Sequence, residues 1–203
     1  MTTYVYTRRL VIGVDEAGRG PLAGPVVAAA VVLCDPAPIG LADSKVLSAR
    51  RRAVLEGEIK GTCRWAVGEA DVATIDRINV FQATMLAMTR AVAALCEELG
   101  AHPDEVLIDG NLTPFGRCAE WIWPARPIVG GDGLEPCISA ASIIAKEHRD
   151  RLMRSHAEIH PHYGWERNAG YGTREHLDAL QRHGITPLHR RSFAPVAQLV
   201  LFL

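Results

Sequence analysis

Hydrophobic runs alternate along the chain with segments of helical periodicity. Short apolar and β-branched runs, typical of buried strands, lie at residues 9–16, 25–34, 63–70 and 105–111. A weaker run at 119–129 is interrupted by Pro124. A turn rich in Gly and Pro separates the first two runs, so we expect their strands to pair as neighbours.

Four other segments have the periodicity of helices. They lie at residues 49–61, 76–100, 137–159 and 174–183. Ser48 and Thr173 are the expected N-caps of the first and last of these helices. The order of strands and helices predicts an α/β fold, in which helices flank a mixed sheet.

Four carboxylates stand at strand ends or between glycines: Asp15, Glu16, Asp109 and Asp132. A carboxylate in an apolar strand is costly unless it is paired, hydrogen-bonded or bound to a cation. Oxygen ligands without nearby Cys or His favour Mg²⁺ or Mn²⁺. Two such cations support phosphodiester hydrolysis. Asp15 and Asp109 also end their strands at the sheet edge where open α/β sheets bind ligands.

Each of these acids has an alternative explanation as an ordinary cap or surface turn. That alternative is strongest for Asp132, which has Gly on both sides. Adjacent strand residues point to opposite faces. Asp15 and Glu16 therefore share a cation only if the strand bends or ends between them, or if Glu16 contributes its backbone carbonyl.

The turn "GRGPLAG" at residues 18–24 resembles a phosphate-binding glycine fingerprint, but its context differs. Such fingerprints open a helix, whereas a β-branched run follows here. An enzyme that binds a nucleotide through this turn is therefore disfavoured. Gly18 and Gly20 still allow the backbone to pass close to a ligand, and Arg19 can bind phosphate or sugar oxygens.

Charge is distributed unevenly along the chain of 203 residues, whose formal net charge is −1. Seven of the eight His, and many of the Arg, follow position 145. The low net charge argues against general coating of nucleic acid, but one basic side can bind a polyanion. A solvated helical face is the alternative explanation of these charges.

The five Cys are scattered and odd in number, which favours reduced thiols over a disulfide framework or a zinc site. The N-terminus lacks the pattern of a signal peptide. The longest apolar run, "PVVAAAVVLC", has about half the length needed to span a bilayer. We therefore expect a soluble, cytoplasmic protein without a membrane partner.

Five segments in order carry a resemblance to a known family: "VDEAGRGPLAGPV", "LADSKVLSARRR", "LIDGN", "ISAASIIAKEHRDR" and "GYGTREHLDALQRHGITPLHRRSFAPV". Together they resemble bacterial ribonuclease HII over residues 10–197. Type III relatives have Lys at the position of Arg19, so type II is favoured. The resemblance implies one RNase H-like domain over residues 1–203, with a five-stranded mixed sheet and a C-terminal helical extension from about residue 160.

The resemblance also implies an activity. The expected enzyme cleaves the RNA strand of RNA–DNA hybrids and incises duplex DNA 5′ to a single ribonucleotide, leaving 3′-hydroxyl and 5′-phosphate ends. By the same resemblance, Asp15, Glu16, Asp109 and Asp132 are the catalytic residues and bind two Mn²⁺ or Mg²⁺ ions. Gly18, Arg19 and Gly20 sense the ribose 2′-hydroxyl, and Tyr171 stacks on the next sugar. Contacts to phosphate are implied for Lys45, Ser139, Ser142 and Lys146.

The sequence departs from the family pattern at two places. Gly130-Gly131 stands where the family usually has Lys-Gly, so one phosphate contact is either missing or supplied by an Arg such as Arg149. Glu147-His148 replaces an apolar residue and a Thr. A charged helical face explains His148 better than a general base does.

The tail "QLVLF" at 198–202 resembles the peptide by which bacterial replication proteins bind the sliding clamp. Such docking requires a free, extended tail. The alternative is that the tail covers the protein's own core. We expect a monomer. A non-catalytic module that binds RNA–DNA hybrids is the main alternative function.

Overall fold

A single mixed sheet forms the centre of the protein. The computed structural model describes residues 9–200. The strands are β1 (Val11–Ala17), β2 (Val26–Val32), β3 (Arg64–Ala70), β4 (Glu105–Asp109) and β5 (Ala125–Ile128). Their order in the sheet is β3-β2-β1-β4-β5. β1 pairs in parallel with β4, and β4 with β5, whereas β1 pairs antiparallel with β2, and β2 with β3. The expected five strands, and the pairing of the first two, are confirmed.

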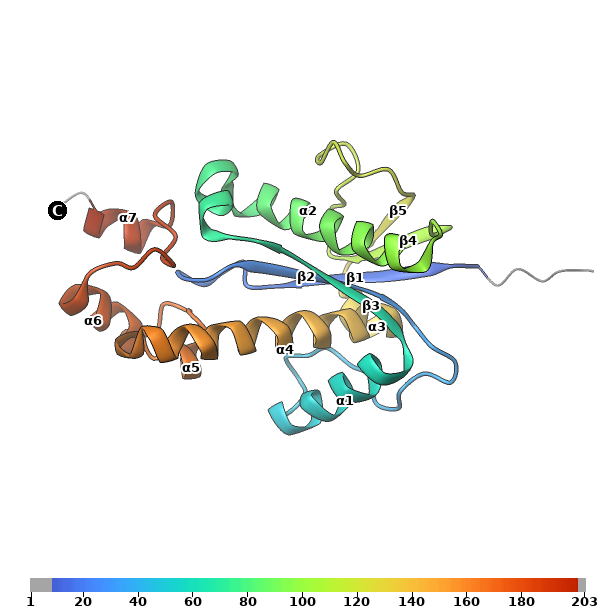
Figure 1. The fold of residues 1–203 in the computed structure, drawn as a ribbon, viewed down its shortest axis with the longest axis horizontal. Helices are drawn as coiled ribbons and strands as arrows, with labels where there is room; N and C mark the ends of the chain where they lie inside the picture. The colour runs from blue at the N-terminus through green and yellow to red at the C-terminus, as the bar shows by residue number, and fades with distance from the viewer. Residues whose placement is uncertain (1–8, 201–203) are drawn as a thin grey trace, which may run out of the picture.

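Helices cover both faces of this sheet (Figure 1). They are α1 (Ala49–Thr62), α2 (Val72–Leu99), α3 (Gly131–Leu134), α4 (Pro136–Ile159), α5 (Trp165–Asn168), α6 (Arg174–His183) and α7 (Ala194–Val200). A 3₁₀ turn, Pro161–Tyr163, lies between α4 and α5. α2 packs on one face and α1 and α4 lie on the other, while α5, α6 and α7 gather around the far end of α4 (Figure 1).

The position of β2 between two helical layers explains why its sequence is apolar throughout. Alternate side chains of a strand face opposite sides of the sheet. Val26, Ala28 and Ala30 pack in the core beneath α2. Ala29 and Val31 pack in the core beneath α1 and α4. A strand with helices on both faces needs apolar residues at every position.

Helix α2 supplies much of the first core. By length and composition it could cross a membrane, yet half of its most apolar window is buried inside the protein, as in a core helix. The helix begins at Val72, earlier than expected, because the Asp71 carboxylate caps it by accepting from Thr74 N at 2.8 Å. It kinks at Asn79, whose φ is 65° and whose side-chain oxygen accepts from Gln82 N at 3.0 Å. Asn79 thus acts as an N-cap inside the predicted helix.

Two sequence-based expectations need correction. Cys34 and Cys63 form a disulfide between the segment after β2 and the end of α1, where reduced thiols were expected. Cys96, Cys118 and Cys137 are free, as expected. The spacing of 29 residues carries no local signal of the pairing, which arises because β2 and β3 are neighbours in the sheet. Residues 161–172, whose Gly and aromatic residues predict a loop, contain the 3₁₀ turn and α5.

The C-terminal segments pack behind the glycine turn at residues 18–24. Backbone hydrogen bonds run from Leu22 N to Gly170 O at 2.8 Å and from Gly24 N to Leu188 O at 2.9 Å. Arg190 N donates to Leu22 O at 2.9 Å. The start of the chain and its last third therefore build this region together.

The predicted tail motif lies partly outside the described residues. Gln198 and Leu199 belong to α7, and Leu199 packs against the core cluster around Val196. These two residues are therefore helical and partly used by the protein's own core, as in the second explanation of the tail. Leu201 and Phe202 lie outside the described residues.

Candidate active site

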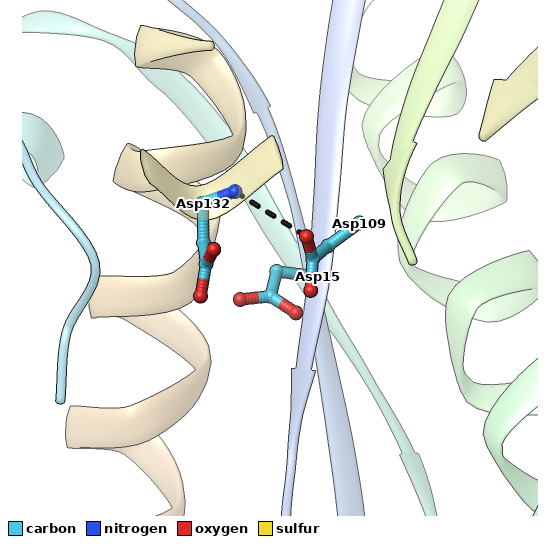
Figure 2. A group of neighbouring side chains, drawn as sticks. All are labelled: Asp15, Asp109 and Asp132. Atoms are coloured by element: carbon cyan, nitrogen blue, oxygen red, sulfur yellow. Dashed lines mark hydrogen bonds between the residues drawn. The ribbon is translucent and has the colours of Figure 1, made fainter. Parts of the chain in front are cut away.

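Three carboxylates from separate segments meet at one edge of the sheet. The parallel register of β1 and β4 places Val14 beside Ile108, so the next residues, Asp15 and Asp109, end up side by side. α3 brings Asp132 to them. One oxygen of each carboxylate lies within 4.8 Å of the others. In Figure 2 the carboxylates of Asp15 and Asp132 face one another, and Asp132 N donates to Asp109 Oδ1 at 3.3 Å.

The electrostatics of this cluster fit a divalent cation. Asp15 is 5 % exposed and Asp132 is 8 % exposed. Burial, followed by the charges of Glu16 and Asp109, holds the pKa of Asp15 well above its usual value. Burial and the neighbouring Asp109 and Asp43 likewise raise the pKa of Asp132. Clustered, desolvated carboxylates are a hard-oxygen donor set that a cation such as Mg²⁺ or Mn²⁺ would stabilise.

Glu16 lies next to this cluster but outside it. β1 stays regular through both acids, since Asp15 pairs with Ala29 and Glu16 with Ala28. The strand therefore neither bends nor ends between the two acids, as sharing a cation through both side chains would require. The Glu16 carboxylate accepts from Arg19 Nη1 at 3.3 Å. Burial raises the pKa of Glu16, and Arg19 partly opposes that rise. A role for Glu16 as the fourth ligand stays a prediction.

A cavity of about 240 Å³ opens in front of the acids. Its lining includes the predicted residues Asp15, Glu16, Gly18, Arg19, Gly20, Lys45, Asp109, Lys146 and Tyr171. Lys45 Nζ lies 3.3 Å from Asp132 Oδ2, and its side chain is 74 % exposed. Lys146 Nζ is paired with Asp150 at 2.6 Å. Both Lys are thus placed at the cavity wall, and Lys45 has the freer charge.

Ser139 and Ser142 do not face the cavity, contrary to the expected phosphate contacts. Ser139 is 4 % exposed, and its hydroxyl donates to Asp132 O at 2.7 Å. Ser142 is 2 % exposed, donates to Ser139 O and accepts from Ser44 N at 3.3 Å. Both sit on the buried face of α4. Their hydroxyls fix the backbone of Asp132 and of the loop that carries Lys45.

Tyr171 stands at the opposite wall of the cavity, beside the glycine turn. Its ring lies near Gly20, where an added Cβ would be 3.4 Å from Tyr171 Cε1, and the residue is 48 % exposed. The buried His176 holds the backbone of Tyr171, and the buried His189 contacts His176. Trp165 Nε1 donates to His176 Nε2 at 3.1 Å, so the proton of His176 is on Nδ1, which donates to Tyr171 O at 2.9 Å. His189 donates to His176 through Nε2 at 3.0 Å.

Arg149 takes a different role from the phosphate contact suggested for it. It is 1 % exposed, and its guanidinium donates to the carbonyls of Pro25, Ala169 and Ala23 at 3.0, 2.8 and 3.0 Å. Arg149 therefore holds backbone rather than substrate. His148 Nε2 lies 2.8 Å from Glu69 Oε1 on β3, which agrees with its interpretation as part of a charged helical face.

Arg190 was missed by the sequence analysis. It is fully buried, and it donates to the carbonyls of Gly18, Arg19 and Gly24. In the sequence it is one of two adjacent Arg in "HRRSF" and is indistinguishable from Arg191, which is exposed. Only the fold separates the two.

Comparison with known proteins agrees with this geometry. The Ribonuclease HII family model matches residues 12–196. Ribonuclease HII of Novosphingobium aromaticivorans is 77 % identical over 192 residues, which cover 94 % of this chain and 98 % of that protein. The ribonuclease HII of Archaeoglobus fulgidus, solved in complex with PCNA, is 25 % identical with a TM-score of 0.72, covering 91 % of this chain and 95 % of that one. Bst-RNase HIII, solved with Mn²⁺, is 20 % identical with a TM-score of 0.75, covering 96 % of this chain and 70 % of that one.

The mixed sheet, its flanking helices and these solved neighbours define a protein with the RNase H-like fold. Within that class, the chain belongs to the ribonuclease HII family. It is a hydrolase with ribonuclease H activity, whose substrates are RNA–DNA hybrids.

Proposed function

We propose that this enzyme also incises duplex DNA on the 5′ side of a single embedded ribonucleotide, leaving 3′-hydroxyl and 5′-phosphate ends. The observation that carries the proposal is one shared cavity. Asp15 and Asp109 of the three-carboxylate cluster, the start of the glycine turn and Tyr171 line the same cavity of about 240 Å³, and Asp132 lies beside these two acids. A scissile phosphate at the acids would therefore place its sugar against the turn.

Asp15, Asp109 and Asp132 would hold divalent cations, and Glu16, which lines the same cavity as Asp15 and Asp109, would be the fourth ligand. When bound, such cations supply activation of water and stabilisation of the leaving oxygen. Lys45, 3.3 Å from Asp132, offers a mobile positive charge to a phosphate oxygen at the mouth of the cavity. The Ser139 hydroxyl keeps the backbone of Asp132 in place.

Selection of the ribonucleotide would come from the turn and the ring. The 2′-hydroxyl is the group that distinguishes RNA from DNA at one position. Arg19 and Gly20 are exposed at the cavity, so their backbone can approach a sugar without an intervening side chain. The Tyr171 ring beside Gly20 offers an apolar face to the neighbouring sugar, which suits deoxyribose better than ribose.

Two further proposals concern the surroundings of the enzyme. We propose a cytoplasmic monomer. We also propose that the tail at 198–202 contacts a sliding clamp, supported by its sequence and by the Archaeoglobus relative solved with PCNA. Deleting residues 198–203 should abolish clamp binding while the enzyme still folds and cleaves. Unchanged clamp binding after the deletion excludes this contact.

One cleavage experiment tests the main proposal. Wild-type enzyme is incubated with two duplexes of identical sequence, one all-DNA and one with a single ribose, in Mg²⁺, in Mn²⁺ and with chelator. We expect one incision 5′ to the ribose, only with metal. Asp109→Asn should abolish cleavage and leave duplex binding largely intact, because the change removes a charge and keeps the shape. Asp178→Asn, on α6 with a half-exposed side chain 3.8 Å from Arg174, is the matched control and should cleave normally.

Two results would contradict the proposal. Cleavage of a long RNA–DNA hybrid without incision at the single ribose would agree with ribonuclease H activity but would contradict the proposed incision at single ribonucleotides. Substantial turnover by Asp109→Asn would show that catalysis does not depend on the Asp109 carboxylate of the cluster.

A further inference from the structure

The glycine turn is fixed from behind by a buried guanidinium. Arg190 Nη2 donates to Gly18 O at 2.6 Å, Nη1 to Arg19 O at 2.9 Å and Nε to Gly24 O at 2.9 Å. The residue is 0 % exposed. Among residues 9–200 no carboxylate pairs with it within 4.0 Å, so its charge is balanced by carbonyl dipoles and by the Phe193 ring, whose centroid lies 5.1 Å from Cζ.

The direction of these carbonyls determines the direction of two N–H groups. In a trans peptide the C=O and the following N–H point in opposite directions. Gly18 O and Arg19 O point inward to Arg190, so the N–H groups of Arg19 and Gly20 point outward to the cavity. Within the described part of the chain neither N–H donates to a protein acceptor. Both residues are exposed at the cavity, so the two donors are free for a ligand.

We infer that Arg190 is a positioning residue for ribose recognition, because it presets two backbone N–H donors toward an oxygen acceptor on the substrate sugar. The inference rests on the proposed function. It adds to that function a residue that does not itself contact the substrate. The guanidinium also polarises the two peptide groups, which strengthens their N–H groups as donors. Gly18 O points toward Arg190, away from the cavity, so the peptide between Gly18 and Arg19 presents its N–H donor to the substrate.

The neighbouring Arg149 provides a matched control. It is equally buried and also donates only to backbone carbonyls, but these belong to Ala23, Pro25 and Ala169. Replacing either Arg by Lys removes a fork of hydrogen bonds and costs stability. Only the change at Arg190 releases the carbonyls of Gly18 and Arg19.

The test compares two duplexes, one with a single ribonucleotide and one with a 2′-fluoro-2′-deoxynucleotide at the same position. Fluorine is a much poorer acceptor than a hydroxyl oxygen. We expect Arg190→Lys to lower the ribose-to-fluoro ratio of kcat/KM by about tenfold, the equivalent of a hydrogen bond or two. Arg149→Lys should keep the wild-type ratio, although both variants lose thermal stability. An unchanged ratio in Arg190→Lys overturns the inference.

A second measurement keeps the inference testable if Arg190→Lys does not fold. Cleavage-deficient Asp109→Asn enzyme, with Arg190 intact, is labelled with ¹⁵N and bound to the ribose duplex or to the all-DNA duplex. The Arg19 and Gly20 amides should shift and gain exchange protection with the ribose duplex only. Equal responses to both duplexes overturn the inference. If the wild-type enzyme does not incise at the single ribose, the proposed function itself is wrong. The cleavage gel alone shows that outcome, so it is distinguishable from a failure of the inference about Arg190.

Discussion

A single methyl group at Gly18 should damage the glycine turn severely. Its φ is +95°, a region that L side chains rarely adopt. A Cβ there would overlap Nε and Cδ of Arg149 and would lie 2.8 Å from Pro25 O. Arg149 is buried and bonded to three carbonyls, so it cannot move aside without losing those bonds.

The expected cost of Gly18→Ala follows from these contacts. Left-handed backbone strain contributes about 1 kcal/mol. Loss of one or two hydrogen bonds from a buried charged group adds about 2–4 kcal/mol. The free energy of unfolding should therefore fall by roughly 3–5 kcal/mol, a large part of the about 5–15 kcal/mol typical of a folded protein. For a chain of this size the melting temperature should fall by about 10 °C.

Gly20→Ala is the matched control. Gly20 lacks a positive φ, and an added Cβ would make only an ordinary contact with Tyr171 at 3.4 Å. Its unfolding free energy should stay within about 0.5 kcal/mol of wild type. Both variants are measured by urea unfolding followed by circular dichroism. If Gly18→Ala is as stable as Gly20→Ala, the steric conflict between a Cβ at position 18 and the Arg149 side chain is refuted.

A double-mutant cycle locates the origin of the cost. Arg149→Ala is destabilising by itself, since it leaves three buried carbonyls without their donor. In that background the methyl group at position 18 has no side chain to displace. Gly18→Ala should then cost clearly less than in wild type, because only the backbone strain of about 1 kcal/mol and the 2.8 Å contact with Pro25 O remain. A full cost in both backgrounds would assign the damage to the backbone instead of to Arg149.

Three further predictions concern stability. Burial, and then the nearby His176, lowers the pKa of His189 to about 3, so the unfolded state binds more protons below about pH 6.5. Between pH 7.5 and pH 5 the free energy of unfolding of wild type should therefore fall by about 2 kcal/mol more than that of His189→Gln. The carboxylates titrate in both proteins, so their effect drops out of this difference. Parallel pH profiles of the two proteins would contradict the prediction. Asp71→Ala removes the cap on Thr74 N and should cost about 1 kcal/mol in urea unfolding, whereas a cost below about 0.3 kcal/mol would refute the cap. Mn²⁺ at about a hundredfold its dissociation constant should stabilise wild type by about 2.7 kcal/mol and Asp109→Asn clearly less, and equal stabilisation of both would place the cation elsewhere.

The sequence predicted the parts of the fold that depend on local pattern. The continuous apolar run of β2 indicated a strand buried on both faces, and Ser48 and Thr173 cap their helices as expected. Asp15 and Asp109 were placed at strand ends, and the parallel register of β1 and β4 then brings them together. Each of these features is set by residues close together in the chain or by one strand pairing.

The remaining features depend on contacts between distant segments. Ser139 and Ser142 resembled phosphate contacts, but the helical phase of α4 turns both to the buried side. Arg149 and Arg190 looked like members of a basic surface, and both are buried under the glycine turn. The kink at Asn79 was hidden inside an apolar pattern that continues through it. Burial of a charged side chain is decided by tertiary packing, which periodicity does not encode.

The two walls of the cavity are each electrostatically incomplete. Asp15, Asp109 and Asp132 crowd together, and the exposed Lys45 lies 3.3 Å from Asp132. Arg149 and Arg190 are buried without a carboxylate at ion-pair distance among residues 9–200. Either arrangement costs stability in the free protein. A cation at the acids would offset the first of these costs, and in the proposed function the phosphate that it binds would bring the substrate sugar to the glycine turn, which both buried Arg hold in place.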